Sequence, residues 1–175
     1  MRSLRRSASG KSHAEIPHGR VLLVTSSGGH LAQLHQIATG WGTEQRRWAS
    51  FDTGNAPFVL AGESVTWAFH PTNRNVANLI RNVRLAWRDV AADPPRALVT
   101  TGAGVAVPYA VACRLRKIPV IYIESMARSE RPSLTGRILY PLSTRFFVQW
   151  PDMVRHFPRA EFHGSSFDFS DSRHS

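Results

Sequence analysis

Cysteine, long apolar runs and acidic residues are all scarce in this chain of 175 residues. The single cysteine, Cys113, lies in an apolar helical stretch, so it is expected to be a small core residue, and no disulfide framework can form. That usage fits a reducing compartment. No segment approaches the roughly 18–20 continuous apolar residues that span a bilayer, and the N-terminus has no apolar signal core. If the chain meets a membrane, it is expected to lie on its surface.

Several cofactor motifs are missing as well. The turn at residues 26–30 does not give the glycine spacing G-x-G-x-x-G of a dinucleotide site, although Asp52 stands where the acid of that motif is expected. No G-x-x-x-x-G-K-[ST] run is present, which excludes a P-loop. The histidines and the cysteine show no zinc spacing. We therefore expect neither a cofactor nor a metal.

Basic residues outnumber acidic ones, with 22 Lys and Arg against 12 Asp and Glu and a net charge of +10. Lysine is limited to Lys11 and Lys117, so nearly all of the positive charge is arginine. This balance favours a negatively charged partner, such as phosphate groups, an anionic membrane surface or nucleic acid. Biased codon usage is the alternative explanation of the high arginine content. No RNA- or DNA-binding motif is present, and nucleic acid is not expected as a partner.

Short apolar runs alternate along the chain with segments of helical periodicity. Strands are expected at residues 21–24, 47–51, 65–69, 97–100, 119–123, 145–149 and 161–163. Helices are expected from about Leu31 and at residues 57–61, 74–91, 107–116, 134–142 and 152–156. The alternation predicts an α/β fold in which a parallel sheet carries helices on both faces. We expect one domain over residues 20–166, a disordered basic tail over 1–19 and a frayed tail over 167–175.

Two glycine turns, at residues 26–29 and 101–104, each follow a predicted strand and lead into a helix. A helix N-terminus offers free N–H groups and a positive dipole end, and parallel sheets bind ligands at the carboxyl ends of their strands. Arginines in the polar loop after the fifth strand can add charge-assisted hydrogen bonds. The pattern predicts a diphosphate site, and tight turns without a ligand are the alternative. The residues expected there are Ser27, Gly28, Gly29, Gly102, Gly104, Arg128 and Arg131.

His30 and Glu124 are the candidate proton-transfer residues. His30 lies at a helix N-terminus, which favours the neutral imidazole that accepts a proton. Glu124 ends the fifth strand near Arg128 and is expected to be ionised. Either side chain can deprotonate a sugar hydroxyl, and the sequence does not choose between them. It also leaves open that His30 only orients a phosphate and that Glu124 only pairs with Arg128.

The helix expected over residues 74–91 has an apolar stripe with a period near 3.6 residues, which is typical of an amphipathic helix. Asn73 is the predicted N-cap. The stripe contains Val76, Leu79, Ile80, Val83, Trp87 and Val90. The basic residues of the helix are Arg74, Arg81, Arg84 and Arg88. They form either a solvated face or a surface directed at a membrane or a phosphate.

Several motifs together resemble those of one known family. They are Val-Thr-Ser-Ser-Gly-Gly-His-Leu at 24–31, Asn-Arg-Asn at 73–75, Thr-Thr-Gly-Ala-Gly-Val-Ala-Val-Pro at 100–108, Ile-Glu-Ser-Met-Ala-Arg at 123–128, Pro-Ser-Leu-Thr-Gly-Arg at 132–137 and Phe-Val-Gln-Trp at 147–150. The pattern resembles the asparagine-linked glycosylation protein fourteen family and its bacterial polysaccharide relatives of the PssD and CpsF type. The loop beginning at Glu124 is the most specific part of the resemblance.

The resemblance implies the Rossmann-like N-terminal half of a split GT-B glycosyltransferase. In the family this half binds a polyprenyl-diphosphate-linked sugar acceptor at the membrane. A separate partner chain binds the UDP-sugar donor, which is of the N-acetylglucosaminyl, glucosyl or glucuronosyl type. Carried over, Gly28, Gly29, His30, Gly102 and Gly104 line the acceptor diphosphate site, and Glu124 lies beside the acceptor sugar. We therefore expect a transferase subunit of polysaccharide or exopolysaccharide synthesis that is inactive without its partner.

The resemblance also implies a location. Eukaryotic relatives carry an N-terminal membrane-spanning helix, whereas this chain begins with a basic polar stretch. Bacterial relatives often lack the helix, so the resemblance is expected to be to them. We expect a cytoplasmic hetero-oligomer, peripheral on the inner face of the plasma membrane. The alternative is a non-catalytic recruiter that binds the membrane and docks a partner carrying all of the chemistry. In that case the arginines of the long helix are needed and His30 and Glu124 are dispensable.

Overall fold

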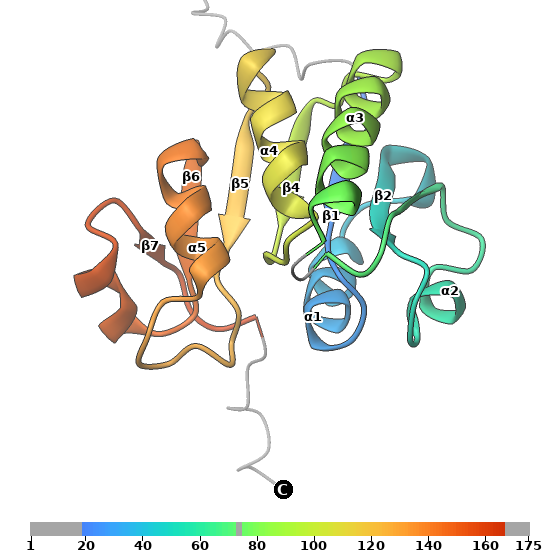
Figure 1. The fold of residues 1–175 in the computed structure, drawn as a ribbon. Helices are drawn as coiled ribbons and strands as arrows, with labels where there is room; N and C mark the ends of the chain where they lie inside the picture. Colours follow the sequence, from blue (N-terminus) through green and yellow to red (C-terminus); the bar gives the residue numbers. More distant parts are fainter. Residues whose placement is uncertain (1–18, 73–74, 167–175) are drawn as a thin grey trace, which may run out of the picture.

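The computed structural model describes residues 19–72 and 75–166. Seven strands form one parallel sheet in the order β3-β2-β1-β4-β5-β6-β7 (Figure 1). The strands are β1 Val21–Val24, β2 Arg46–Phe51, β3 Val65–Ala68, β4 Ala97–Thr100, β5 Val120–Ile123, β6 Arg145–Val148 and β7 Glu161–Phe162. The predicted α/β fold is confirmed, and each strand lies within one residue of its expected bounds.

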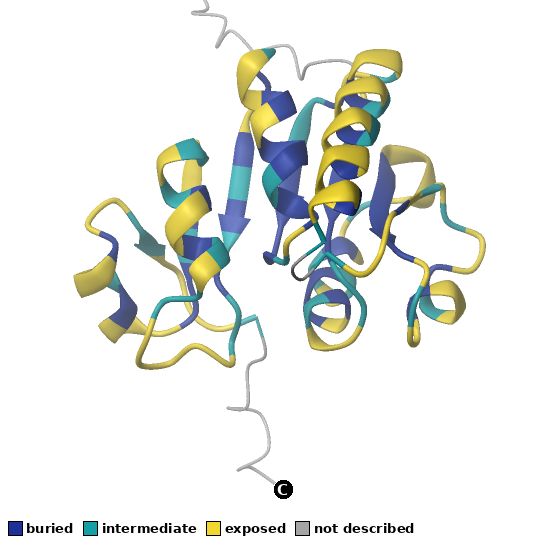
Figure 2. Cartoon of the chain, in the orientation of Figure 1, coloured by how far each residue is buried: buried dark blue, intermediate teal, exposed yellow. Residues whose placement is uncertain are grey.

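Helices cover both faces of this sheet. They are α1 Gly29–Ala38, α2 Ala56–Val59, α3 Val76–Ala92, α4 Ala106–Leu115 and α5 Leu134–Leu139, with 3₁₀ turns at Thr43–Gln45, Tyr140–Leu142 and Pro151–His156. One hydrophobic core joins the sheet to α3, α4 and α5, and a second joins its other face to α1 and α2 (Figure 2). Cys113 is buried in the first core, as expected, and burial raises the pKa of its thiol to about 12.

The order of the strands reverses between β1 and β4. These strands are neighbours in register, with Val24 opposite Thr100, and the Thr100 hydroxyl donates to the Val24 carbonyl at 2.6 Å. The chain leaves β1 toward one side of the sheet and β4 toward the other, which opens a crevice at their carboxyl ends. The two glycine turns follow these two strands, so the topology brings them together.

Helix α3 is placed differently from the prediction. Its N-cap is Asn75, whose side chain accepts a hydrogen bond from the Asn78 amide at 3.0 Å, and its first residue is Val76. The predicted cap Asn73 and the basic residue Arg74 lie outside the described residues. The helix also turns its polar side to the sheet. Its buried residues are Asn78, Asn82, Ala86 and Val90.

The apolar stripe of α3 is therefore mostly exposed, and only Val90 of its six members is buried. Val76 is 68% exposed, and Leu79, Ile80, Val83 and Trp87 are about half exposed. The reason lies in the connection from β3 to α3. The Asn82 side chain accepts from the Phe69 amide at 2.8 Å and donates to the Phe69 carbonyl at 2.9 Å, while Asn78 donates to the Pro71 carbonyl. The two asparagine side chains thus supply hydrogen-bond partners to backbone N–H and C=O groups of the connection, which apolar side chains would leave unpaired.

No helix in the described part of the chain is long and apolar enough to cross a membrane. The tails predicted at residues 1–19 and 167–175 fall almost entirely outside the described residues, so both stay predictions.

Candidate functional site

A cleft of about 290 Å³ lies at the carboxyl ends of the central strands. It contains three of the predicted site residues, Ser27, His30 and Gly104. The rest of its lining comes from the last residue of β2 and from segments that follow β1, β2, β3 and β4. These residues are Ser26, Phe51, Thr53, His70, Pro71, Thr72 and Ala103.

The first glycine turn forms the start of α1. Gly28 has a φ of +79° and is the N-cap, with no side-chain capping hydrogen bond. Its own N–H donates to the Asn55 Oδ1 atom at 3.1 Å, so this amide already has a partner. Gly29 is the first helical residue, and a Cβ there would meet nothing within 4 Å. The N–H groups available to an anion are thus those of the first helical turn, which begins at Gly29.

The second glycine turn is more crowded. Gly102 has a φ of +109°, and a Cβ on it would lie 3.2 Å from the Tyr122 hydroxyl and 3.7 Å from His30 Cε1. Gly104 approaches Thr72, whose hydroxyl would lie 3.3 Å from an added Cβ. Helix α4 follows, and its N-cap Val105 provides no side-chain hydrogen bond. Two helices without side-chain caps therefore begin beside the same cleft.

His30 lies between the two turns. The Thr101 hydroxyl donates to the His30 main-chain carbonyl at 3.0 Å, and the ring nitrogen Nδ1 is buried with no hydrogen-bond partner among the described residues. Burial lowers the pKa of His30 below its ordinary value of 6.5, and the positive charge of Arg128 lowers it further. The Thr101 backbone and the Glu124 carboxylate oppose this shift of the His30 pKa without reversing it. His30 is consequently a neutral imidazole near pH 7 that can accept a proton.

Glu124 is also close to His30, but its carboxylate is turned into the protein. It is 1% exposed. Its Oε1 atom accepts from the Tyr122 hydroxyl and the Ser125 amide, and its Oε2 atom accepts from the amide and the hydroxyl of Ser133. Among the described residues it forms no ion pair with Arg128, the partner that the sequence suggested as one alternative.

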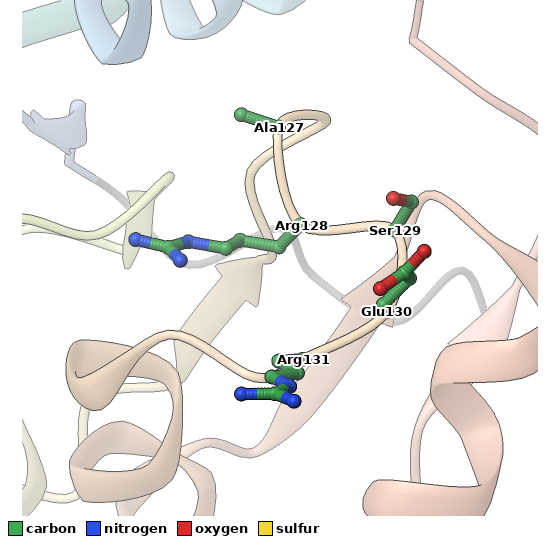
Figure 3. A pocket seen from close by; sticks show the side chains of 5 residues that line it. All are labelled: Ala127, Arg128, Ser129, Glu130 and Arg131. Atoms are coloured by element: carbon green, nitrogen blue, oxygen red, sulfur yellow. The ribbon is translucent and has the colours of Figure 1, made fainter.

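The arginines of the polar loop lie beside this cluster. Residues Ala127 to Arg131 line a shallow hollow of about 200 Å³, and Figure 3 shows the Arg128 side chain extending to one side of the loop, away from Ser129 and Glu130. The charge of Arg128 acts on the pKa of both His30 and Tyr122. Arg131 lines the same hollow, and neither arginine lines the 290 Å³ cleft.

Three polar residues of the cleft were missed from the sequence. Thr53, His70 and Thr72 follow β2 and β3, where the sequence indicated only turns. Their position at the carboxyl ends of predicted strands is the signal that could have identified them. The basic residues of α3 are elsewhere. Arg81, Arg84 and Arg88 line a separate hollow together with Phe69 and Leu85.

No group of three His, Cys, Asp or Glu side chains that could hold a metal ion occurs within the described ranges. The features of the cleft are instead a neutral imidazole, several hydroxyls, helix N-termini and a nearby guanidinium. Such a set can bind an anion and accept a proton.

Solved structures with a similar fold include MurG and a UDP-N-acetylglucosamine 2-epimerase. MurG of Acinetobacter baumannii superposes with a TM-score of 0.70 and 19% identity, over 85% of this chain and 46% of that one. A UDP-N-acetylglucosamine 2-epimerase from Rickettsia bellii gives a TM-score of 0.66 and 12% identity, over 85% and 46%. At these identities the likeness shows the fold alone, which is the Rossmann-like arrangement of one half of a GT-B enzyme.

Curated relatives are similar in sequence. The UDP-N-acetylglucosamine transferase subunit ALG14 of Eremothecium gossypii is 36% identical over 104 residues, which is 56% of this chain and 46% of that protein. The subunit of the same name from Rattus norvegicus is 26% identical over 192 residues, which is 88% of this chain and 87% of that protein. The alignment with the first relative spans less than half of its length.

A family model, the Alg14-like oligosaccharide biosynthesis proteins, matches residues 63–166. The matched region holds the second glycine turn, Glu124 and the arginine loop, whereas the first glycine turn and His30 precede it. Because the match covers more than half of the 175 residues, the chain belongs to the Alg14-like family of oligosaccharide biosynthesis proteins.

Proposed function

We propose that the chain is the acceptor-binding subunit of a heteromeric glycosyltransferase. Its substrate is a polyprenyl-diphosphate-linked sugar, and the donor is a UDP-sugar held by a separate partner subunit. The observation that carries the proposal is the cleft at the ends of β1 and β4, where a neutral His30 stands between two helix N-termini. The names of the relatives support both the nucleotide-sugar donor and the need for a partner.

The acceptor diphosphate fits the anion-binding features of the site. The first turns of α1 and α4 supply N–H groups and two positive dipole ends, each contributing about 0.3–1 kcal/mol. Ser27 and Thr72 add hydroxyls in the cleft, and Arg128 and Arg131 add positive charge from the neighbouring loop. Gly28, Gly29, Gly102 and Gly104 keep the turns free of side chains. Several donors act at once, as a firm diphosphate site requires.

His30 is the general base in this proposal. An acceptor-sugar hydroxyl gives its proton to the imidazole while its oxygen attacks the anomeric carbon of the donor sugar. The bond from that carbon to the UDP oxygen breaks, UDP leaves, and the configuration at the carbon inverts. A base with a depressed pKa stays unprotonated at neutral pH, which the step requires. Glu124, the other candidate base, points both oxygens at internal donors and is less suited to reach a sugar.

The exposed stripe of α3 supports a peripheral membrane location, which we propose to be on the cytoplasmic face. It joins α4 in an apolar groove of about 140 Å³, lined among others by Leu79, Trp87 and Val111. Arg81, Arg84 and Arg88 border the stripe on the same helix, and Arg116 stacks on Trp87 at 3.8 Å. Exposed apolar side chains with arginines beside them are typical of segments that bind an anionic lipid surface, and each arginine contributes about 1 kcal/mol to the binding free energy. The same observation favours the second candidate, a non-catalytic membrane recruiter of the partner transferase.

Reconstitution tests the two candidates. The chain is combined with its partner subunit, a UDP-sugar and a polyprenyl-diphosphate-linked sugar, and transfer is measured for wild type and His30→Gln. General-base catalysis predicts a loss of about 10²–10⁴-fold in kcat. His35→Gln is the matched control, because His35 lies on the same helix and stacks on Trp48 instead. Wild-type turnover by His30→Gln would exclude His30 as the base and favour the recruiter.

A further inference from the structure

The loop of residues 125–132 carries Arg128 and Arg131, yet its tip has few contacts with the rest of the protein. Residues 127–131 are exposed. Both ends of the loop are held by buried polar side chains, one from α1 and one from the residue directly after β5. The two side chains are Gln33 and Glu124.

Gln33 holds the first half of the loop. It lies on α1 one turn after His30 and is 3% exposed. Its amide nitrogen donates to the Glu124 carbonyl and its amide oxygen accepts from the Met126 N–H, both at 3.4 Å. Trp150 donates to the Met126 carbonyl at 2.9 Å. The main chain before Arg128 is thus bound to the helix that carries His30.

Glu124 holds the second half of the loop. Its Oε2 atom accepts from the Ser133 amide at 3.3 Å and the Ser133 hydroxyl at 3.2 Å. Ser133 in turn caps α5 by accepting from the Gly136 amide at 2.8 Å. The Oε1 atom binds Tyr122 and the Ser125 amide, so one carboxylate closes the loop at both of its ends.

The donors that surround Glu124 are neutral hydroxyls and backbone amides. A buried carboxylate needs such donors because burial without them is costly. The packing leaves little spare room, since a Cβ on Gly136 would collide with the Oε2 atom. A carboxylate in this setting acts on the loop that surrounds it and has no open side for a sugar hydroxyl.

We propose that Glu124 and Gln33 are positioning residues that hold the loop of residues 125–132 in the shape that presents Arg128 beside His30. The ligand of the loop, which is the diphosphate of the acceptor, rests on the proposed function. The hydrogen bonds that close the loop do not depend on that function. Glu124 then acts through Arg128 and takes no proton.

Limited proteolysis of the full chain tests the assignment without any transferase assay. Trypsin cleaves after Arg128, whereas Arg131 precedes a proline and resists cleavage. Glu124→Gln keeps the shape of the side chain, but its new NH₂ group faces donors that the carboxylate oxygen accepted from. Gln33→Met keeps the volume of the side chain and removes both of its hydrogen bonds. We expect each variant to speed cleavage between Arg128 and Ser129 about tenfold. Glu44→Gln removes the same charge at an exposed position on another element and should be cleaved like wild type.

Turnover in the complex separates positioning from catalysis. We expect Glu124→Gln to raise the acceptor KM about tenfold and to keep an acid limb in the pH profile, which moves to lower pH because the Glu124 carboxylate raises the pKa of His30. Cleavage of both variants at the wild-type rate overturns the assignment. A kcat loss of about a hundredfold or more for Glu124→Gln, with the acid limb gone and KM unchanged, also overturns it. If the wild-type complex transfers no sugar, the proposed function fails and the proteolysis still decides the role of Glu124 and Gln33.

Discussion

The hydroxyl of Thr101 donates a hydrogen bond of 3.0 Å to the main-chain carbonyl of His30. This contact joins the first turn of α1 to the end of β4, two elements that lie on opposite sides of the strand-order reversal. It holds His30 against the second glycine turn, where Gly102 leaves room for the ring. The position of the imidazole therefore depends on both halves of the sheet.

The pH dependence of transfer follows from the lowered pKa of His30. Because the neutral imidazole is the active form in the proposed mechanism, kcat/KM should be flat near pH 7 and fall only as the pH drops through a pKa below 6.5. Arg128→Gln removes a positive charge that lowers this pKa, so the acid limb should move to higher pH. Arg131→Gln is the control and should leave the limb in place. An acid limb of the wild-type enzyme above pH 6.5 would contradict the assignment of His30.

The reversed orientation of α3 can be tested by stability. Asn82→Ala leaves the Phe69 amide and carbonyl without their partners, and we expect it to lower the free energy of unfolding by about 2–3 kcal/mol. Val83→Asn, one residue further on, changes an exposed side chain and should stay within about 0.5 kcal/mol. Urea titrations of both variants give the comparison. If the apolar stripe were the buried face, the two results would be exchanged.

Gly136 offers a test of the packing around Glu124. Replacing glycine by alanine inside a helix normally stabilises it by about 0.5–1 kcal/mol. Here the new methyl group would collide with the Glu124 carboxylate and lie 2.9 Å from the Ser133 hydroxyl, so we expect a destabilisation of about 1–3 kcal/mol. Gly29→Ala, at the start of α1 and facing open space, is the matched control. Equal effects in thermal unfolding would show that the carboxylate can move aside.

Membrane binding by α3 predicts a dependence on lipid charge. With about 1 kcal/mol for each arginine, Arg84→Gln combined with Arg88→Gln should weaken binding to anionic vesicles about thirtyfold. Arg155→Gln combined with Arg159→Gln gives the same net charge and removes arginines outside α3, so it should bind nearly as well as wild type. Vesicle sedimentation at several salt concentrations measures the difference. A similar loss in both double variants would point to net charge and away from this helix.

The fold was predictable because buried parallel strands and glycine turns leave strong local patterns. The apolar run at Val21–Val24 and the turn before α4 were both identified from sequence. The two glycine turns could be paired because parallel strands end at one edge of the sheet. The orientation of α3 could not be predicted, since periodicity marks an apolar face without saying what covers it. Asn82 is buried by a backbone segment that sequence patterns do not represent.

The site was only partly predictable for a similar reason. Glu124 was identified from its place after β5, but its partner Ser133 lies across a loop, and no spacing rule gives that contact. Gln33 went unnoticed because a glutamine within a helix is ordinarily a surface residue. His70 was missed because the segment after β3 was treated only as a turn. Contacts between loops are set by tertiary packing, which a single sequence does not encode locally.

The pairing of β1 with β4 determines when the cleft can form during synthesis of the chain. The hydrogen bond from Thr100 to Val24 spans 76 positions, and closing so long a loop is entropically costly and slow compared with local hairpins. A chain emerging from the ribosome can assemble β1, β2 and β3 while the second wall of the cleft is still unmade. The acceptor binding that we propose must therefore await completion of β4, and on that proposal an unfinished chain cannot sequester the lipid-linked sugar.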